Sequence, residues 1–245
     1  IADETSEPIG DASRRAMRYL KEMAATHSTF VIDLIANLTR LLSQMGYQQG
    51  IHYDRADLER LAELGQRHSL VYLPSHKSNF DHLVLCSLLY ENGLPPNHSA
   101  GGINLNFFPV GPLVRRAGVF FIRRSFKDNA LYKYVLKQYI DYLLSKRFPL
   151  EWFIEGGRSR SGKLRAPAFG MLAYVADSYR RGSCEDAVLV PVAIAYDQIF
   201  DMDAYTSEQR GGAKEKEGLS WLVRAVQTLR RGYGRISVQF GEPLF

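Results

Sequence analysis

The fold is decided by residues 70–81, LVYLPSHKSNFD, in which a short apolar run leads into a polar loop and then into an apolar helical pattern. The four apolar residues before Pro74, residues 70–73, are typical of a buried strand. The pattern of residues 80–92 predicts a helix directly after the loop. A strand, a loop and a helix in this order are the repeating unit of an α/β protein.

The same alternation continues through the rest of the chain. Further apolar runs predict strands at residues 119–122, 152–154, 188–195 and 236–240. Between them, helical patterns occupy residues 130–147, 171–181 and 219–231. We therefore predict the α/β class, with a mixed, largely parallel central sheet flanked by helices. In such folds the loops at the strand ends carry the functional groups.

An N-terminal helical region precedes this sheet. Residues 11–45 lack Pro and Gly, and apolar residues recur at helical spacing from Val31 to Met45, which predicts an amphipathic helix or helix pair that stops near Gly46. A second helix, residues 54–66, begins at an Asp cap. We divide the chain into a helical region, residues 1–68, and an α/β domain, residues 69–245. The amphipathic face either packs on the core or lies on a membrane surface.

Composition excludes several classes of protein. With 245 residues, 46% of them hydrophobic and 23% charged, the chain can bury a substantial core, which excludes disorder, collagen and a disulfide-stapled miniprotein. Cys86 and Cys184 form no Cys-x-x-Cys pair and suit a reducing compartment. No apolar run reaches the roughly 18 residues that a membrane span needs. Because the chain begins with Ile1 and shows no signal peptide, we expect a portion of a longer protein.

Positive charge is concentrated in one segment. The chain has 31 Lys and Arg against 26 Asp and Glu. Residues 115–165 hold 13 basic and 4 acidic residues, which leaves 18 basic and 22 acidic residues elsewhere. Such a local field attracts phosphate, nucleic acid, a phosphorylated cofactor or an acidic membrane surface.

The loop after the first strand holds His76 and Asp81. On one continuous helix, residues five apart would point about 140° away from each other. They can meet if His76 lies on the turn before the helix and Asp81 lies in its first turn. The carboxylate would then fix the tautomer of the imidazole and leave its other nitrogen as a base.

Three further loops carry unusual residues. Arg123 and Arg124 follow a strand, where guanidinium groups can bind a phosphate. Residues 155–163, EGGRSRSGK, combine paired glycines with positive charge, but their spacing does not match a P-loop. Residues 190–192, VPV, place a proline within an apolar run. We expect no metal, since the six histidines show no ligand-spaced pair with acids or cysteines.

In this order, the four loops resemble the four motifs of the glycerolipid acyltransferases, the His-x4-Asp enzymes that acylate glycerol 3-phosphate or lysophosphatidate. Residues 76–81, 118–124, 153–159 and 190–192 match them in turn, so the resemblance covers residues 69–245. The sequences FFIRRSF and EGGRSRSGK are similar to the branch that uses glycerol 3-phosphate or dihydroxyacetone phosphate. Residues 208–217 also resemble this branch, although Gln209 stands where leucine is common.

The resemblance implies an acyl transfer without an acyl-enzyme. His76 would take the proton of the sn-1 hydroxyl of glycerol 3-phosphate, and Asp81 would orient the imidazole. The hydroxyl oxygen would attack an acyl thioester, either acyl-CoA or acyl carrier protein, as co-substrate. The product would be lysophosphatidate, in the first step of phospholipid synthesis.

The resemblance also implies a set of substrate-binding residues in the second and third loops. Three arginines are assigned to the phosphate, a Glu-Gly pair to the acceptor pocket, and two further cations to the remaining electrostatics. In that order they are Arg124, Arg158 and Arg160, then Glu155 and Gly156, then Arg123 and Lys163. No cofactor is implied.

Two alternatives stay open at the level of sequence. One is a dihydroxyacetone-phosphate acyltransferase, because both acceptors present a phosphate three carbons from the attacking hydroxyl. The other is a non-enzymatic basic module that binds RNA or anionic lipid through residues 115–165. For the preferred enzyme we expect a membrane surface as partner, no nucleic acid, and a peripheral position on the cytoplasmic side of a cell membrane.

Overall fold

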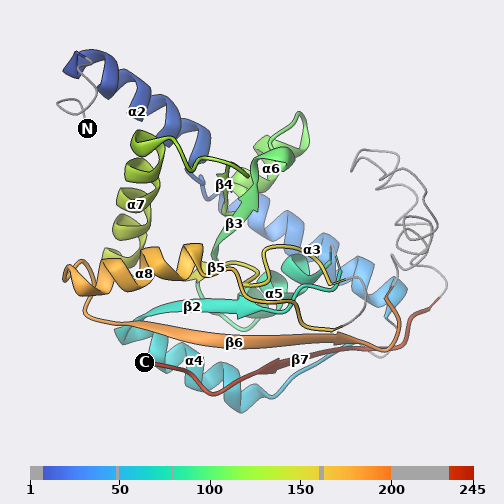
Figure 1. Ribbon diagram of the computed structural model, residues 1–245. Helices are drawn as coiled ribbons and strands as arrows, with labels where there is room; N and C mark the ends of the chain where they lie inside the picture. Colours follow the sequence, from blue (N-terminus) through green and yellow to red (C-terminus); the bar gives the residue numbers. More distant parts are fainter. Residues whose placement is uncertain (1–7, 48–49, 79, 160–162, 200–231) are drawn as a thin grey trace.

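The computed structural model describes residues 8–47, 50–78, 80–159, 163–199 and 232–245, and its centre is a sheet with helices on both faces (Figure 1). Within these residues the sheet has seven strands in the order β1-β7-β6-β2-β5-β3-β4. The strands are β1 (Ile51–His52), β2 (Ser69–Pro74), β3 (His98–Gly102), β4 (Val119–Ile122), β5 (Leu150–Glu151), β6 (Ala187–Tyr196) and β7 (Ile236–Phe240). The helices are α2 (Ile9–Met23), α3 (Thr29–Gly46), α4 (Arg55–Arg67), α5 (Asp81–Glu91), the 3-10 turn η1 (Ile103–Leu105), α6 (Val110–Arg116), α7 (Ala130–Ser145) and α8 (Gly170–Arg180).

The sheet is mixed and largely parallel, as the sequence predicts. β2 pairs in parallel with β5 and β6, and β3 pairs in parallel with β4 and β5. β7 runs antiparallel to β6, and β1 is added beyond it in parallel. The carboxyl ends of β2, β4, β5 and β6 therefore share one edge of the sheet, which is where parallel sheets place their functional loops.

Alternating side chains of the strands divide the core between two faces. On β2, Leu70 and Tyr72 pack into a buried cluster with α3, α4 and α5. Val71, between them, packs on the opposite face with α2, α7 and α8. This period of two is the geometry of a pleated strand, and it produces three layers: helices, sheet and helices.

The described part of the N-terminal region forms three helices, α2, α3 and α4, and it also joins the sheet. The predicted Asp54 cap is confirmed, since its carboxylate accepts the N–H of Ala56 at 2.9 Å. Ile51 of β1 pairs with Ile236 of β7, so residues before position 69 contribute a strand. No helix within the described ranges is long and apolar enough to cross a membrane.

The apolar stripe of α3 is divided between the core and the surface. Val31 and Leu42 are each 8% exposed and lie on the protein side, where α3 packs against α5. Leu34, Leu38 and Leu41 are about half exposed. The spacing predicts one apolar face, whereas the structure buries only part of it.

Besides β1, two strands in the parallel part of the sheet differ from the sequence prediction. The strand predicted at residues 152–154 is found at Leu150–Glu151, and the chain turns soon afterwards, where the N–H of Gly156 bonds to the carbonyl of Phe153. β3, with the sequence HSAGG, has almost no apolar signal. A Cβ at Gly101 would lie 2.7 Å from Cγ1 of Val119, so the small residues permit close packing on β4. The helix predicted at residues 219–231 lies outside the described residues.

Candidate active site

His76 and Asp81 meet at the carboxyl end of β2. His76 lies in the loop after Pro74, and Asp81 begins α5. Nδ1 of His76 lies 3.0 Å from Oδ2 of Asp81. The hydroxyl of Ser78 accepts the N–H of Phe80 at 3.2 Å and supports the turn into the helix. The turn-and-helix arrangement that the sequence predicts for the two residues is therefore present.

Asp81 is fully buried and is held by several donors. Its Oδ2 accepts the main-chain N–H groups of Lys77 at 2.7 Å and Ser78 at 2.8 Å. Its Oδ1 accepts the hydroxyl of Tyr196, at the end of β6, at 2.6 Å. A carboxylate surrounded by donors acts as an acceptor, so Nδ1 of His76 carries the proton and the lone pair of Nε2 is left able to accept one. The sequence gives no signal for the role of Tyr196.

The loop after β5 fixes the imidazole. The ring of Phe153 stacks on the ring of His76, with centroids 3.7 Å apart and planes 11° apart. The N–H of Ser159 donates to the carbonyl of His76 at 2.7 Å. A single loop, far from His76 in sequence, thus holds the histidine from its ring and from its main chain.

Glu155 supports this arrangement from the same loop. Its Oε1 accepts the N–H of His76 at 3.0 Å, and its Oε2 accepts the N–H of Arg165 at 2.8 Å. The side chain is buried. Gly156 has a φ of 64°, a left-handed conformation that favours glycine, and follows Glu155 at the exposed surface of the loop. Glu155 thus supports the loop that carries His76, and Gly156 forms the turn beside it.

Arg123 is engaged with the N-terminal helix α2. Its guanidinium donates two hydrogen bonds of 2.7 Å to the carboxylate of Glu22. It also lies 4.9 Å from the ring centroid of Tyr19 and 5.0 Å from that of Tyr132. The hydrogen bonds to Glu22 raise the pKa of Arg123 above its usual range. The structure therefore gives this arginine a partner within the protein, apart from the group around His76.

Two of the other predicted cations are exposed at the surface. Arg124 and Lys163 are exposed, and Arg158 is half-buried in the loop that also carries Glu155. The carbonyl of Arg158 accepts a hydrogen bond from the guanidinium of Arg165 at 3.4 Å. Arg160 lies outside the described residues.

Arg115, in the basic segment, contacts the C-terminal end of α2. The guanidinium of Arg115 donates to the carbonyls of Lys21 at 3.1 Å and Glu22 at 2.7 Å, and also to that of Ala24. These carbonyls lie at the C-terminal end of α2, where a cation complements the helix dipole. The charge surplus in the sequence therefore overstates the cations available to a ligand.

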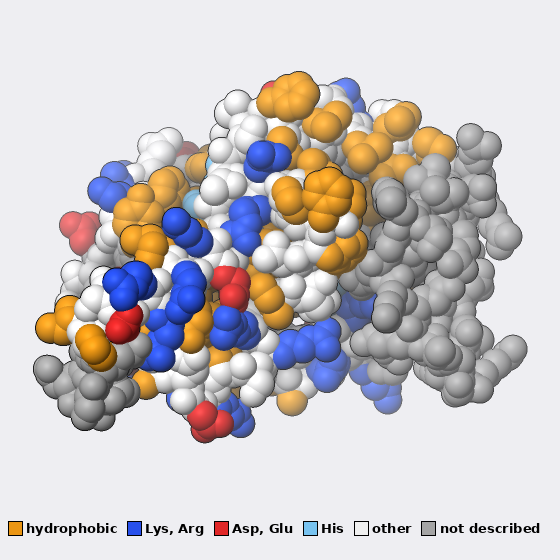
Figure 2. Space-filling view, turned by 90° about the horizontal axis from the view of Figure 1, so that it is seen from above, with side chains coloured by type: hydrophobic (Ala, Val, Ile, Leu, Met, Phe, Trp, Pro, Cys, Tyr) orange, Lys and Arg blue, Asp and Glu red, His pale blue; other side chains and the backbone are white. Residues whose placement is uncertain are grey.

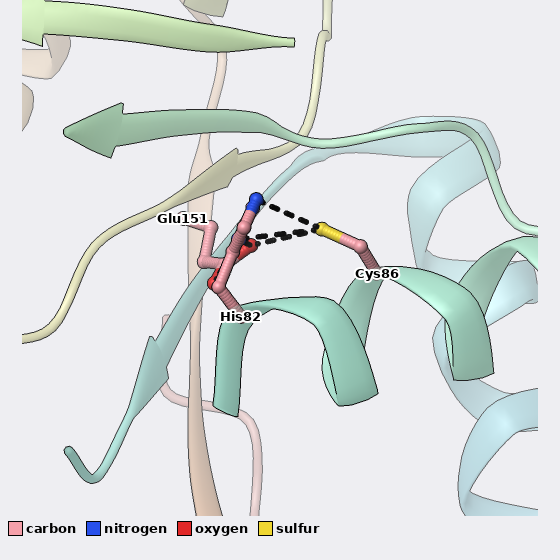
Figure 3. A group of neighbouring side chains, drawn as sticks. All are labelled: His82, Cys86 and Glu151. Atoms are coloured by element: carbon pink, nitrogen blue, oxygen red, sulfur yellow. Dashed lines mark hydrogen bonds and ion pairs between the residues drawn. The ribbon is translucent and has the colours of Figure 1, made fainter. Parts of the chain in front are cut away.

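A second polar cluster lies on the α5 face of the sheet, and Figure 3 shows its three side chains turned toward one another. His82 and Cys86 of α5 face Glu151 of β5, in an arrangement that can hold a metal ion. The sequence argument against a metal overlooks this pair, because residues four apart lie on one side of a helix. Burial opposes the charge on His82, but Cys86 and Glu151 outweigh it and raise its pKa well above the usual value.

Comparison with known proteins agrees with this geometry. Residues 55–195 match the family model described as Acyltransferase, and residues 205–245 match that of the glycerol-3-phosphate acyltransferase C-terminal region. The chain is 39% identical to a glycerol-3-phosphate acyltransferase of Pseudomonas putida (strain GB-1), covering 100% of this chain and 30% of that protein. It is 40% identical to one of Haemophilus ducreyi, covering 97% and 29%. The chain thus spans less than a third of the length of these relatives.

Structural comparison concerns the fold. The crystal structure of the 1-acyl-sn-glycerophosphate (LPA) acyltransferase PlsC from Thermotoga maritima is similar with a TM-score of 0.50, covering 96% of this chain and 77% of that one at 14% identity. The α/β fold is shared. With the family model matching more than half of the chain and the His76–Asp81 pair in place, this chain belongs to the acyltransferase family.

Proposed function

We propose that this chain is the catalytic part of a glycerol-3-phosphate 1-O-acyltransferase. The observation that carries the proposal is the contact between His76 and Asp81, held in one orientation by Tyr196 and Phe153. The choice of glycerol 3-phosphate rests on the match of residues 205–245 and on the names of the relatives. The donor is an acyl thioester, either acyl-CoA or acyl carrier protein.

The chemistry follows from the position of the proton on His76. Nε2 removes the proton of the sn-1 hydroxyl as its oxygen attacks the thioester carbonyl. The tetrahedral intermediate collapses, the C–S bond breaks, and the proton passes from the imidazolium to the leaving thiolate. Asp81 stabilises the imidazolium between the two steps. The products are 1-acyl-glycerol 3-phosphate and the free thiol.

We assign the acceptor phosphate to cations of the second and third loops. Arg158 is the principal candidate, because its loop is joined to the His76 loop through Glu155 and Ser159. The remaining candidates are Arg124, Arg160 and Lys163. We assign Arg123 a smaller role in phosphate binding, because the carboxylate of Glu22 already neutralises its charge.

A main-chain amide of the glycine pair is the candidate for stabilising the oxyanion. The N–H of Gly156 is used in a turn with the carbonyl of Phe153 at 2.9 Å. The amide of Gly157 is therefore the better placed of the two. Gly157 lies close to Arg165, because a Cβ added at Gly157 would stand 2.8 Å from a guanidinium nitrogen of that arginine.

The direct test is release of free thiol from palmitoyl-CoA by the purified full-length protein, with and without glycerol 3-phosphate. Release that depends on the acceptor supports the proposal, and equal release in both arms contradicts it. Competition with dihydroxyacetone phosphate decides between the two acceptors. A binding module would give no thiol in either arm.

We also propose that the protein lies peripherally on the cytoplasmic face of a cell membrane. Phe30, Leu34, Leu38 and Leu41 expose an apolar face of α3, which packs against α6 near the exposed Phe108. Figure 2 shows hydrophobic side chains beside a group of Lys and Arg side chains on one face of the molecule. Basic residues of α2 also line a surface hollow: Arg14, Arg15, Arg18 and Lys21. Apolar and basic surfaces side by side suit anionic lipid.

Flotation with anionic vesicles tests this position. The wild-type protein should float, and Leu38→Asp should float less because it places a charge in the exposed apolar face. Gln44→Asp, also on the exposed side of α3, is the matched control for the added charge. Equal flotation of all three proteins would contradict a role for this face.

A further inference from the structure

The cluster of His82, Cys86 and Glu151 is built on a row of side chains across three strands. Glu151 of β5 lies beside Tyr72 of β2 on one side and Ser99 of β3 on the other. Since neighbours in register point to the same face, all three face α5. The helix places His82 and Cys86 one turn apart above Glu151 (Figure 3).

Three atoms of the cluster form a nearly equilateral triangle. Nδ1 of His82 lies 3.2 Å from Oε2 of Glu151 and 3.5 Å from Sγ of Cys86. Sγ of Cys86 lies 3.4 Å from the same Oε2. In a tetrahedral zinc site, the usual bond lengths place a nitrogen and an oxygen about 3.4 Å apart, and sulfur about 3.6 Å from either. The three sides are close to these lengths. Sγ also lies 3.8 Å from Nε2 of His82, so the sulfur stands over the face of the ring, and binding requires the imidazole to turn until Nδ1 points at the ion.

The surroundings of Glu151 resemble the second layer of a metal site. Oε2 accepts the hydroxyl of Ser99 at 2.8 Å and the side-chain N–H of Asn97 at 3.2 Å. Glu151, Ser99 and Asn97 are all buried. Hydrogen bonds of this kind hold a ligating carboxylate in one orientation. Nδ1 of His82 contacts both carboxylate oxygens, Oε1 at 3.1 Å and Oε2 at 3.2 Å, so either oxygen is within reach of an ion held by the imidazole.

We infer that His82, Cys86 and Glu151 bind a divalent transition-metal ion, above all zinc, through Nδ1, Sγ and Oε2. A nitrogen, a sulfur and an oxygen ligand together suit the borderline softness of zinc and exclude magnesium and calcium, which take oxygen ligands. The side chain of His82 is 24% exposed. A water molecule would complete the four ligands of the ion.

Binding of the ion is balanced in charge. The thiol of Cys86 and the Nδ1 position of His82 release their protons to solvent. The thiolate and the carboxylate then neutralise the two positive charges of zinc, and the imidazole is neutral. A buried site with no net charge avoids the cost of an uncompensated ion.

The site would tie the start of α5 to β5. His82 directly follows Asp81, and Glu151 lies four residues before Glu155 on the chain. The ion would thus join the two segments whose loops hold His76, at a place outside the acyl-transfer site. It has a positioning role and takes no part in the proposed reaction.

Cobalt absorption tests the ligands without reference to activity. Purified full-length protein is stripped with a chelator and titrated with Co²⁺. We expect the visible bands of a tetrahedral ion and a near-ultraviolet sulfur-to-cobalt band, both removed by added Zn²⁺. Cys86→Ser should abolish the sulfur band, whereas Cys184→Ser, which changes the other free cysteine, should retain it. No bands at all, or their loss in both variants, would overturn the assignment.

Zinc affinity and thermal stability provide a second measurement. The wild-type protein should retain one zinc ion per chain on dialysis, and a hundredfold excess over Kd should raise Tm by roughly 5 °C or more. Ser99→Ala should weaken zinc binding by roughly 10- to 100-fold through the lost hydrogen bond to Glu151. If Cys86→Ser binds zinc as tightly as the wild type, or if neither binds it, the three side chains form a hydrogen-bonded cluster only.

Discussion

The carboxylate of Glu155 accepts the main-chain N–H of His76 at 3.0 Å, so an acid from the loop after β5 holds the loop that follows β2. The same carboxylate holds Arg165 through its other oxygen. A single buried side chain therefore connects two segments of the catalytic edge. Its loss should affect the position of the base more than the binding of a ligand.

Glu155→Gln tests this connection. The amide keeps one acceptor oxygen but turns an NH2 group toward the second main-chain N–H. We expect the free energy of unfolding to fall by about 1–3 kcal/mol and kcat to fall by at least roughly 10-fold, with a smaller change in KM. Urea denaturation and steady-state kinetics measure both. Glu63→Gln, on an exposed position of α4, is the control, and an equal effect there would contradict the assignment.

His76→Ala removes the base itself. We expect kcat to fall by roughly 10²- to 10⁴-fold, with a smaller effect on affinity for the acceptor. The exposed His52→Ala should retain full activity. A non-enzymatic module would lose nothing measurable in either variant, so retained thiol release by His76→Ala would remove the residue from the mechanism.

Tyr196→Phe isolates the hydroxyl that donates to Oδ1 of Asp81 at 2.6 Å. A hydrogen bond to a charged group contributes about 1.5–3 kcal/mol, so we expect a measurable loss of stability and a fall in kcat of roughly 10-fold. Tyr179→Phe removes a hydroxyl from an exposed tyrosine and serves as the control. If Tyr196→Phe changes only KM, the hydroxyl contacts the substrate rather than supporting Asp81.

Arg158→Ala should affect acceptor binding, whereas Arg123→Ala should affect stability. Removing Arg158 should raise KM for glycerol 3-phosphate by roughly 10- to 100-fold, because a phosphate ligand is lost. Removing Arg123 should lower the free energy of unfolding by about 1–2 kcal/mol through the lost contacts with Glu22 and two tyrosine rings, with little change in KM. Acceptor kinetics and denaturation of both variants measure these effects. If KM rises in Arg123→Ala and stability falls in Arg158→Ala, then Arg123 is the phosphate ligand and Arg158 the structural residue.

The pair of His27 and His98 should make the fold sensitive to acid. Burial, together with the nearby His27, lowers the pKa of His98 from 6.5 to about 3. The unfolded chain binds a proton below pH 6.5 that the folded chain does not bind until near pH 3, so stability falls as pH falls through this interval. The slope is at most about 1.4 kcal/mol per pH unit for this group. Denaturation of the wild type and His98→Gln at several pH values measures it, and identical slopes would contradict the prediction.

The strands and helices with strong apolar patterns could be predicted from the sequence. Val119–Ile122 and Ile236–Phe240 have the predicted bounds, because each run is largely apolar and lies between a glycine and an arginine. The strand His98–Gly102 could not be predicted from the sequence, because its small residues fit a close contact with β4 and show little apolar character. Pattern analysis detects burial through side-chain chemistry and does not detect close packing of glycines.

The site could be predicted only where the sequence brings residues together. His76 and Asp81 are five positions apart, so local geometry was enough to place them. Phe153 and Tyr196 reach His76 and Asp81 through the sheet, and no spacing reports such contacts. The pairing of Arg123 with Glu22 has the same origin, because residues 101 positions apart meet only after α2 has packed.

The contact between Arg123 and Glu22 also bears on shortened forms of the protein. A form that lacked α2 would leave a guanidinium group without its acid at the end of β4, next to Arg124. Such a truncated form would bind polyanions at a place where the longer chain does not. Helix α2 thus lowers the positive charge at this edge through Glu22, in addition to covering the sheet.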